Sequence, residues 1–196
     1  MNQAASSTAY LSLATSNEIR FERSGRDFVL HARQWLPATA ETIWSFVADC
    51  RHMNHVIPGF MRFEVLNLEA GQTPPAIAPG VRYEYKLHLH GLGFFWRTLI
   101  TEVERPHRFE DVQDKGPYSH FSHEHLFEPE GEGTMTTDII RYRPPGGPLA
   151  KLIDAAMVRR DLRKLFVCRH RRMAELFADG GDPAATFLTP DSSASA

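Results

Sequence analysis

The sequence contains few cysteines and no long apolar run. Only two of its 196 residues are cysteine, and Cys50 and Cys168 stand far apart, so neither a disulfide framework nor a metal-binding cysteine motif is present. We therefore expect a reducing, cytoplasmic location. No stretch approaches the roughly 20 apolar residues of a membrane-spanning helix, and residues 1–20 lack the basic start and apolar core of a signal peptide. The sequence predicts a soluble protein without integral membrane association.

An excess of charge of one sign is also missing. Lysine and arginine number 22 and aspartate and glutamate 24, which gives a net charge of −2 and no overall attraction to nucleic acid. The sequence contains no phosphate-binding loop, dinucleotide fingerprint or nucleophile elbow, so we expect no cofactor. What is present is an ordinary globular composition, with 42% hydrophobic and 23% charged residues. Such a chain can bury a sizeable core.

The two ends differ in composition from the middle. Residues 1–20 are rich in Ser, Ala and Thr, and residues 179–196 carry Gly, Pro and Ser with little to bury, so both are expected to be disordered tails. Between them there is no internal repeat and no linker. The sequence predicts one domain over residues 21–178.

Most of this domain has the alternating pattern of strands. A first strand over 28–36 is followed by two short helices, the first capped by Thr39 or Thr42 and the second near 51–56. The alternation is clearest over 81–90, where aromatic and aliphatic residues alternate with charged residues and histidines. Counting the first strand, seven are expected, at 28–36, 60–67, 81–90, 94–103, 109–113, 119–127 and 134–143.

A long helix is expected after the strands, because residues 148–177 contain no internal glycine or proline. Its apolar face changes direction partway along. We expect the second apolar stripe to pack on the sheet, so that the first stripe faces elsewhere, over the mouth of a cavity. A kink in the helix explains the same change of apolar face. The first stripe consists of Leu149, Leu152, Ile153 and Ala156, and the second of Val158, Leu162, Leu165, Phe166, Met173, Leu176 and Phe177.

Several segments carry a resemblance to a known superfamily. They are Trp96 with Thr98 and Ile100, the stretch 109–127, and Thr137-Asp138 with Tyr142 before the prolines at 144–145. With this order of elements, the chain resembles the SRPBCC superfamily, which includes START-type lipid-transfer, polyketide cyclase/dehydrase-like and coenzyme Q-binding proteins. The resemblance implies an α+β helix-grip fold, in which a curved antiparallel sheet of about seven strands wraps around the C-terminal helix.

The resemblance also implies a cavity between the sheet and the long helix. We expect the protein to bind or transport a small hydrophobic molecule there, such as a lipid, a quinone or a polyketide. The alternative is that the same side chains fill a solid core, and a module that binds another protein with a vestigial cavity also stays open. The expected ligand-binding residues are Tyr83, Tyr85, Leu87, Leu89, Trp96, Phe121, His123, His125, Tyr142 and Ile153.

Two histidines on one strand leave three interpretations open. His123 and His125 share a face, since side chains two apart on a strand point the same way. They could form a structural network with Glu110, Asp111, Glu124 or Asp138, contact the ligand, or act with Asp138 as the acid and base of a cyclase- or dehydratase-like enzyme. A metal site is not expected, because this strand supplies only two ligands and His88 and His90 lie three strands away.

The basic residues of the last helix allow two interpretations. They are compatible with a transient contact with an anionic membrane or an acidic partner. They also encircle the helix, which is typical of a solvated surface. These residues are Arg159, Arg160, Arg163, Lys164, Arg169, Arg171 and Arg172.

Overall fold

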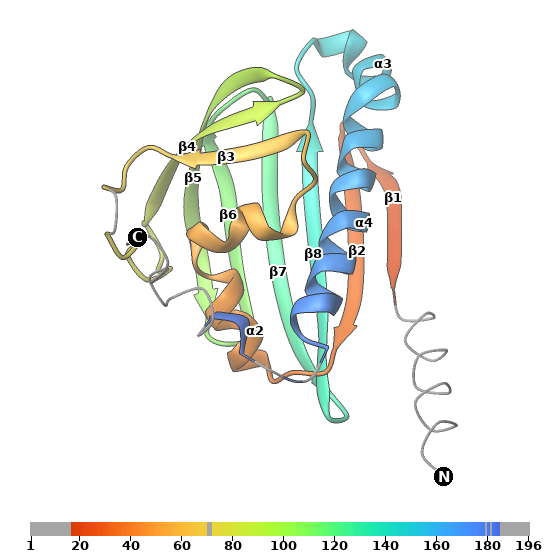
Figure 1. The fold of residues 1–196 in the computed structure, drawn as a ribbon. Helices are drawn as coiled ribbons and strands as arrows, with labels where there is room; N and C mark the ends of the chain where they lie inside the picture. The colour runs from red at the N-terminus through yellow and green to blue at the C-terminus, as the bar shows by residue number, and fades with distance from the viewer. Residues whose placement is uncertain (1–16, 70–71, 179, 181, 185–196) are drawn as a thin grey trace.

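The computed structural model describes residues 17–69, 72–178, 180 and 182–184 (Figure 1). One antiparallel sheet of eight strands curves around the helices, in the order β1-β2-β8-β7-β6-β5-β4-β3. This is the expected α+β helix-grip architecture. The strands are β1 (Glu18–Ser24), β2 (Asp27–Leu36), β3 (Met61–Val65), β4 (Arg82–Leu89), β5 (Leu92–Glu104), β6 (Arg108–Lys115), β7 (His120–Glu130) and β8 (Gly133–Arg143).

The additional strand is β1, which begins three residues before the expected domain boundary at residue 21. It pairs with β2 from Glu18 opposite Arg33 to Ser24 opposite Asp27. A turn through Gly25, whose φ of +60° suits glycine, joins the two strands. Ile19 and Phe21 pack against the core while their neighbours stay exposed. This short alternation, next to a Ser- and Ala-rich stretch, is the signal that the sequence prediction missed.

Two short helices lie against the concave face of the sheet. Helix α2 (Ala40–Val47) begins after Thr39, whose hydroxyl accepts a hydrogen bond from the Thr42 amide, as predicted for a capping threonine. The second predicted helix is the 3₁₀ helix η1 (Cys50–Val56), which starts after the capping residue Asp49. Together they cover the β6 and β7 side of the concave face (Figure 1).

The C-terminal helix contains a change of helical type at the point where the sequence predicted that its apolar face turns. It consists of η2 (Gly147–Leu149), α3 (Ala150–Ile153), the π-helical turn η3 (Asp154–Val158) and α4 (Arg159–Leu176). A π-helical turn holds an extra residue, so the side chains after it are rotated relative to those before it. The second predicted stripe therefore packs on the sheet, whereas Leu149 and Leu152 of the first stripe are exposed.

The core lies between the sheet and these helices. Under α4, Leu30 of β2 packs with Phe166 in one apolar cluster, and near α2, Trp44 packs with Phe127 in another. Ala184, which falls in the predicted C-terminal tail, is buried in the second cluster. Of the other residues in the two predicted tails, most lie outside the described residues.

Candidate ligand cavity

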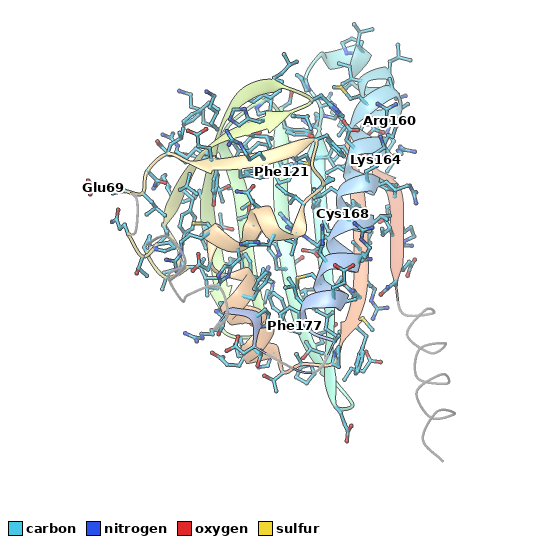
Figure 2. The ribbon with its side chains drawn as sticks, in the orientation of Figure 1. Glu69, Phe121, Arg160, Lys164, Cys168 and Phe177 are labelled. Atoms are coloured by element: carbon cyan, nitrogen blue, oxygen red, sulfur yellow. The ribbon has the colours of Figure 1, made fainter. Side chains whose placement is uncertain are left out.

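A cavity of about 330 Å³ opens between the concave face of the sheet and the helices. Residues of strands β2 to β8 form its wall, and residues of α2, η1, α3, η3 and α4 form its roof. Phe121 lies on the sheet side, to the left of α4 in this view, and Arg160, Lys164 and Cys168 follow one another along that helix (Figure 2). The enclosure results from the curvature of the sheet, which leaves more room than the side chains fill.

The alternation of β4 supplies much of the apolar wall. Tyr83, Tyr85 and Leu87 are buried and face the cavity, while Arg82, Glu84 and Lys86 point to the opposite face. All of the expected ligand-binding residues except Tyr142 line the cavity. The lining members of that set are Tyr83, Tyr85, Leu87, Leu89, Trp96, Phe121, His123, His125 and Ile153.

Tyr142 was expected at the cavity and lies elsewhere. It is fully buried, and its ring stacks on Phe28. Its hydroxyl donates a hydrogen bond to Asp154 at 2.6 Å, and Arg159 donates to the other oxygen of the same carboxylate. Tyr142 therefore holds the π-helical turn to β8, which is a structural role.

The phenols and the thiol of the wall are neutral hydrogen-bonding groups at neutral pH. Burial raises the pKa of Tyr83 to about 12, and its hydroxyl donates to the Pro75 carbonyl at 2.6 Å. Burial likewise raises the pKa of Tyr85 well above its ordinary value and that of Cys50 to about 11. This part of the wall can thus orient a polar atom of a guest without presenting a charge.

One polar part of the cavity lining is a cluster of two histidines and two aspartates. Asp111 of β6 pairs in register with His123 of β7, and Asp138 of β8 pairs in register with His125. The Nε2 atom of His123 donates to Asp138 at 2.8 Å, and the Nε2 atom of His125 donates to Asp111 at 3.2 Å. Arg169 of α4 approaches Asp138 to 3.6 Å from the roof.

The two imidazoles have opposite pKa shifts. Burial, together with the charge of His125, lowers the pKa of His123. Burial also opposes a charge on His125, but the hydrogen bonds to Asp111 and Asp138 outweigh it and raise the pKa. For Asp138, burial is likewise outweighed by its bonds to both histidines, and its pKa lies well below the ordinary value. Within this coupled group, a proton is therefore favoured on His125 over His123.

The structure assigns the faces that the sequence left open. Of the four acidic residues considered as partners, only Asp111 and Asp138 face the cavity. Glu124 binds Arg108, and Glu110 accepts a hydrogen bond from Thr101.

The other two strand histidines lie apart from this cluster. His88 of β4 pairs with Glu64, and His90, in the turn after β4, pairs with Asp161. β5 and β6 separate β4 from β7. β4 and β7 are therefore three strand spacings apart, as expected for a simple meander.

The roof contributes residues that the sequence prediction omitted. Cys50, His52 and Met53 reach the cavity from η1, and Arg169 and His170 reach it from α4. A signal for the last two is their position between Phe166 and Met173 on the buried face of the helix, where a charged residue is unusual.

Several basic residues of the last helix have partners within the chain. Arg159 binds Asp154, Arg169 approaches Asp138, and Arg172 binds Glu175. These pairs favour the interpretation of a solvated helix surface. None of the described helices has the length and apolarity needed to cross a membrane.

Comparison with known proteins agrees with this architecture. Protein Ms6760 from Mycobacterium smegmatis has a TM-score of 0.58 at 16% identity, with 80% of this chain and 95% of that chain covered. A protein from Arthrobacter aurescens has a TM-score of 0.60 at 13% identity, covering 80% and 91%. TTHA0849 from Thermus thermophilus has a TM-score of 0.53 at 20% identity, covering 75% and 97%. At such identities the likeness concerns the fold alone.

Sequence comparison adds the family. No curated protein matches the chain. The profile of the family described as polyketide cyclase / dehydrase and lipid transport matches residues 36–166, from the end of β2 into α4. This match covers more than half of the chain and includes β3 to β8, all of which contribute residues to the cavity lining. The chain therefore belongs to the polyketide cyclase/dehydrase and lipid transport family.

Proposed function

We propose that the protein binds a small hydrophobic molecule in the cavity between the sheet and the C-terminal helix and carries it. The observation that supports this most directly is the cavity itself, about 330 Å³ with aromatic and aliphatic side chains along β4 and β5. A site of this size and lining suits an apolar body, and a few polar groups orient it. A lipid, a quinone and a polyketide all have such a body with one or more oxygens.

The two histidines and two aspartates are gathered in one part of the cavity lining, which suggests how the guest lies. Its apolar part would pack against Tyr85, Leu87 and Trp96, and an oxygen would reach the cluster of His123 and His125. Burial of the apolar part supplies most of the affinity, at about 25 cal/mol per Å² removed from water. The hydrogen bonds would select among guests of similar size.

The test is native mass spectrometry of the protein purified from its host, followed by organic extraction. We expect a fraction of the protein to carry an added mass that extraction removes, and the extract to contain one class of apolar molecule. Refolded protein, exposed to the same extract, should regain that mass. If the purified protein carries no extractable molecule and gains none from a lipid extract of the host, the proposal is wrong.

A cyclase- or dehydratase-like enzyme is the second candidate. What favours it is the placement of His123, His125 and Asp138 together at the cavity, where proton transfer to a bound guest is geometrically accessible. Incubating the extracted molecule with the wild-type protein and with His123→Phe distinguishes the two functions. A product formed only by the wild-type protein indicates the enzyme, and unchanged ligand in both samples indicates the carrier.

Two further expectations stay predictions. The cytoplasmic location was predicted from the cysteine content, and the transient membrane contact from the basic residues of the last helix. The exposed Leu149 and Leu152 lie on the same helix, beside Lys151. Co-sedimentation with anionic vesicles, compared between the wild-type protein and Leu152→Glu, tests the membrane contact.

A further inference from the structure

The polar cluster brings together three atoms of the kind that bind transition metals. Asp111, His123 and His125 each offer one ligand atom, and these three atoms all lie within 4.8 Å of one another. The Oδ2 atom of Asp111 is 3.2 Å from Nε2 of His125 and 4.0 Å from Nδ1 of His123. Ligands about 2.1 Å from a tetrahedral metal are about 3.4 Å apart. The two observed distances lie on either side of this ligand–ligand distance. Small side-chain rotations would therefore bring the three atoms to the spacing of metal ligands.

A fourth residue, Asp138, holds the imidazoles in the orientation that a metal would need. A single oxygen of its carboxylate lies 2.8 Å from Nε2 of His123 and 3.0 Å from Nδ1 of His125. The remaining nitrogen of each ring is the one that faces Asp111. A histidine that binds a metal usually donates its other N–H to a carboxylate, which fixes its ring orientation and tautomer. Here one carboxylate does this for both histidines.

The strand register explains why the arrangement is rigid. His123 and His125 are two apart on β7, and β6 and β8 flank them with Asp111 and Asp138 in directly opposite positions. All four side chains therefore come from the hydrogen-bonded centre of the sheet. A site built on strands keeps its ligands in place better than a site built on loops.

The charge of the cluster also suits a cation. With neutral imidazoles, Asp111 and Asp138 outweigh Arg169 by one negative charge, and the group is largely buried. Buried charge requires a partner. A divalent metal between Asp111 and the two rings would supply that partner.

We propose that Asp111, His123 and His125 form a binding site for a divalent first-row transition metal, with Asp138 as the outer carboxylate that orients both rings. Two imidazoles and one carboxylate suit Zn²⁺ or Fe²⁺, whereas Mg²⁺ and Ca²⁺ favour oxygen ligands. The same three residues line the cavity, so the remaining coordination position faces the cavity and is available to water or to an oxygen of a guest. The sequence pattern showed only two ligands on one strand, and the neighbouring strand provides the third.

The test is a titration of full-length, chelator-treated protein with Zn²⁺ by calorimetry, without any apolar ligand. We expect one Zn²⁺ per chain in the wild-type protein and at least about tenfold weaker binding in Asp138→Asn, the range seen when an outer partner of a metal ligand is removed. Asp111→Asn, which removes a ligand carboxylate, should weaken binding further. His120→Gln is the matched control, because His120 lies on the same strand, contacts Asp27 at 3.2 Å and is 41% exposed. It should bind Zn²⁺ as the wild-type protein does.

A second measurement keeps the test independent of variant folding. Co²⁺ added to the wild-type protein should produce visible absorption bands of a four- or five-coordinate site, and one equivalent of Zn²⁺ should remove them. Equal Zn²⁺ affinity in the wild-type protein and folded Asp111→Asn, or a Co²⁺ spectrum of the hexa-aqua ion alone, would refute the proposal. The metal titration contains no apolar ligand, so its failure would not contradict the proposed carrier function. Conversely, the absence of an apolar molecule from the purified protein would not contradict the proposed metal site.

Discussion

Replacing a leucine by phenylalanine at two matched positions tests whether the cavity exists. Leu87 on β4 lines the cavity, whereas Leu30 on β2 is fully buried against Phe166 and does not line it. In a packed core, additional side-chain atoms force neighbours out of their rotamers at about 1–3 kcal/mol. At a cavity wall they enter free space. The same substitution should therefore have different effects at the two sites.

The expected magnitudes follow from these surroundings. Leu30→Phe should lower the melting temperature by about 2–12 °C, since about 1–3 kcal/mol corresponds to about 2–4 °C per kcal/mol for a protein of this length. Leu87→Phe should change the free energy of unfolding by less than about 1 kcal/mol, the lower limit of overpacking. It should also weaken binding of an apolar fluorescent dye about tenfold, as expected if the dye loses two methylene contacts of about 0.8 kcal/mol each.

The assays are thermal unfolding followed by circular dichroism and dye titration by fluorescence, both on the full-length chain. Leu30→Phe should retain the dye affinity of the wild-type protein below its melting temperature. If both variants are destabilised equally and neither changes dye binding, the space beside Leu87 is a packed core. The placement of the ligand would then be wrong.

Two further predictions concern groups outside the apolar wall. Tyr142→Phe should lower the free energy of unfolding, measured by urea titration, by about 1.5–3 kcal/mol, the value of a hydrogen bond to a charged group. The reason is that Asp154 then keeps only its hydrogen bonds from Arg159. Dye binding should not change. Burial opposes the charge of Asp49, but its hydrogen bonds from Arg51 outweigh burial and lower its pKa. Its contribution to stability is therefore present above the unfolded pKa of about 3.9 and is lost as the pH falls through the lower folded value. Asp49→Asn should lose less stability than the wild-type protein between pH 6 and pH 2 in urea titrations, and equal losses would show that Arg51 does not stabilise the carboxylate.

The local patterns of the sequence predicted the elements and many of the faces. The alternation over 81–90 placed Tyr83, Tyr85 and Leu87 on one side of a strand, and the structure confirms that side as buried. The two-residue spacing of His123 and His125 placed them on one face. Such patterns are local, because the side-chain period of a strand depends on the backbone of that strand alone.

Prediction stopped where the answer depended on another element. Nothing in the sequence showed whether Glu110 or Asp111 would meet the histidines, since moving by one residue along a strand changes the face of the sheet. The pairing of β6 with β7 selected Asp111. In the same way, Tyr142 was predicted at the cavity from its strand and superfamily resemblance, but Asp154 from the helix covers it.

The sequence by itself therefore determined the order of the strands and helices after β1, the faces of the clearest strands and the position at which the last helix changes its apolar side. Only the tertiary structure decided that a π-helical turn causes this change, that Asp111 and Asp138 flank the two histidines, and that Arg169 approaches from the roof. The physical reason is that these contacts join residues far apart in the chain. Their geometry depends on strand register and helix packing, which no local period specifies.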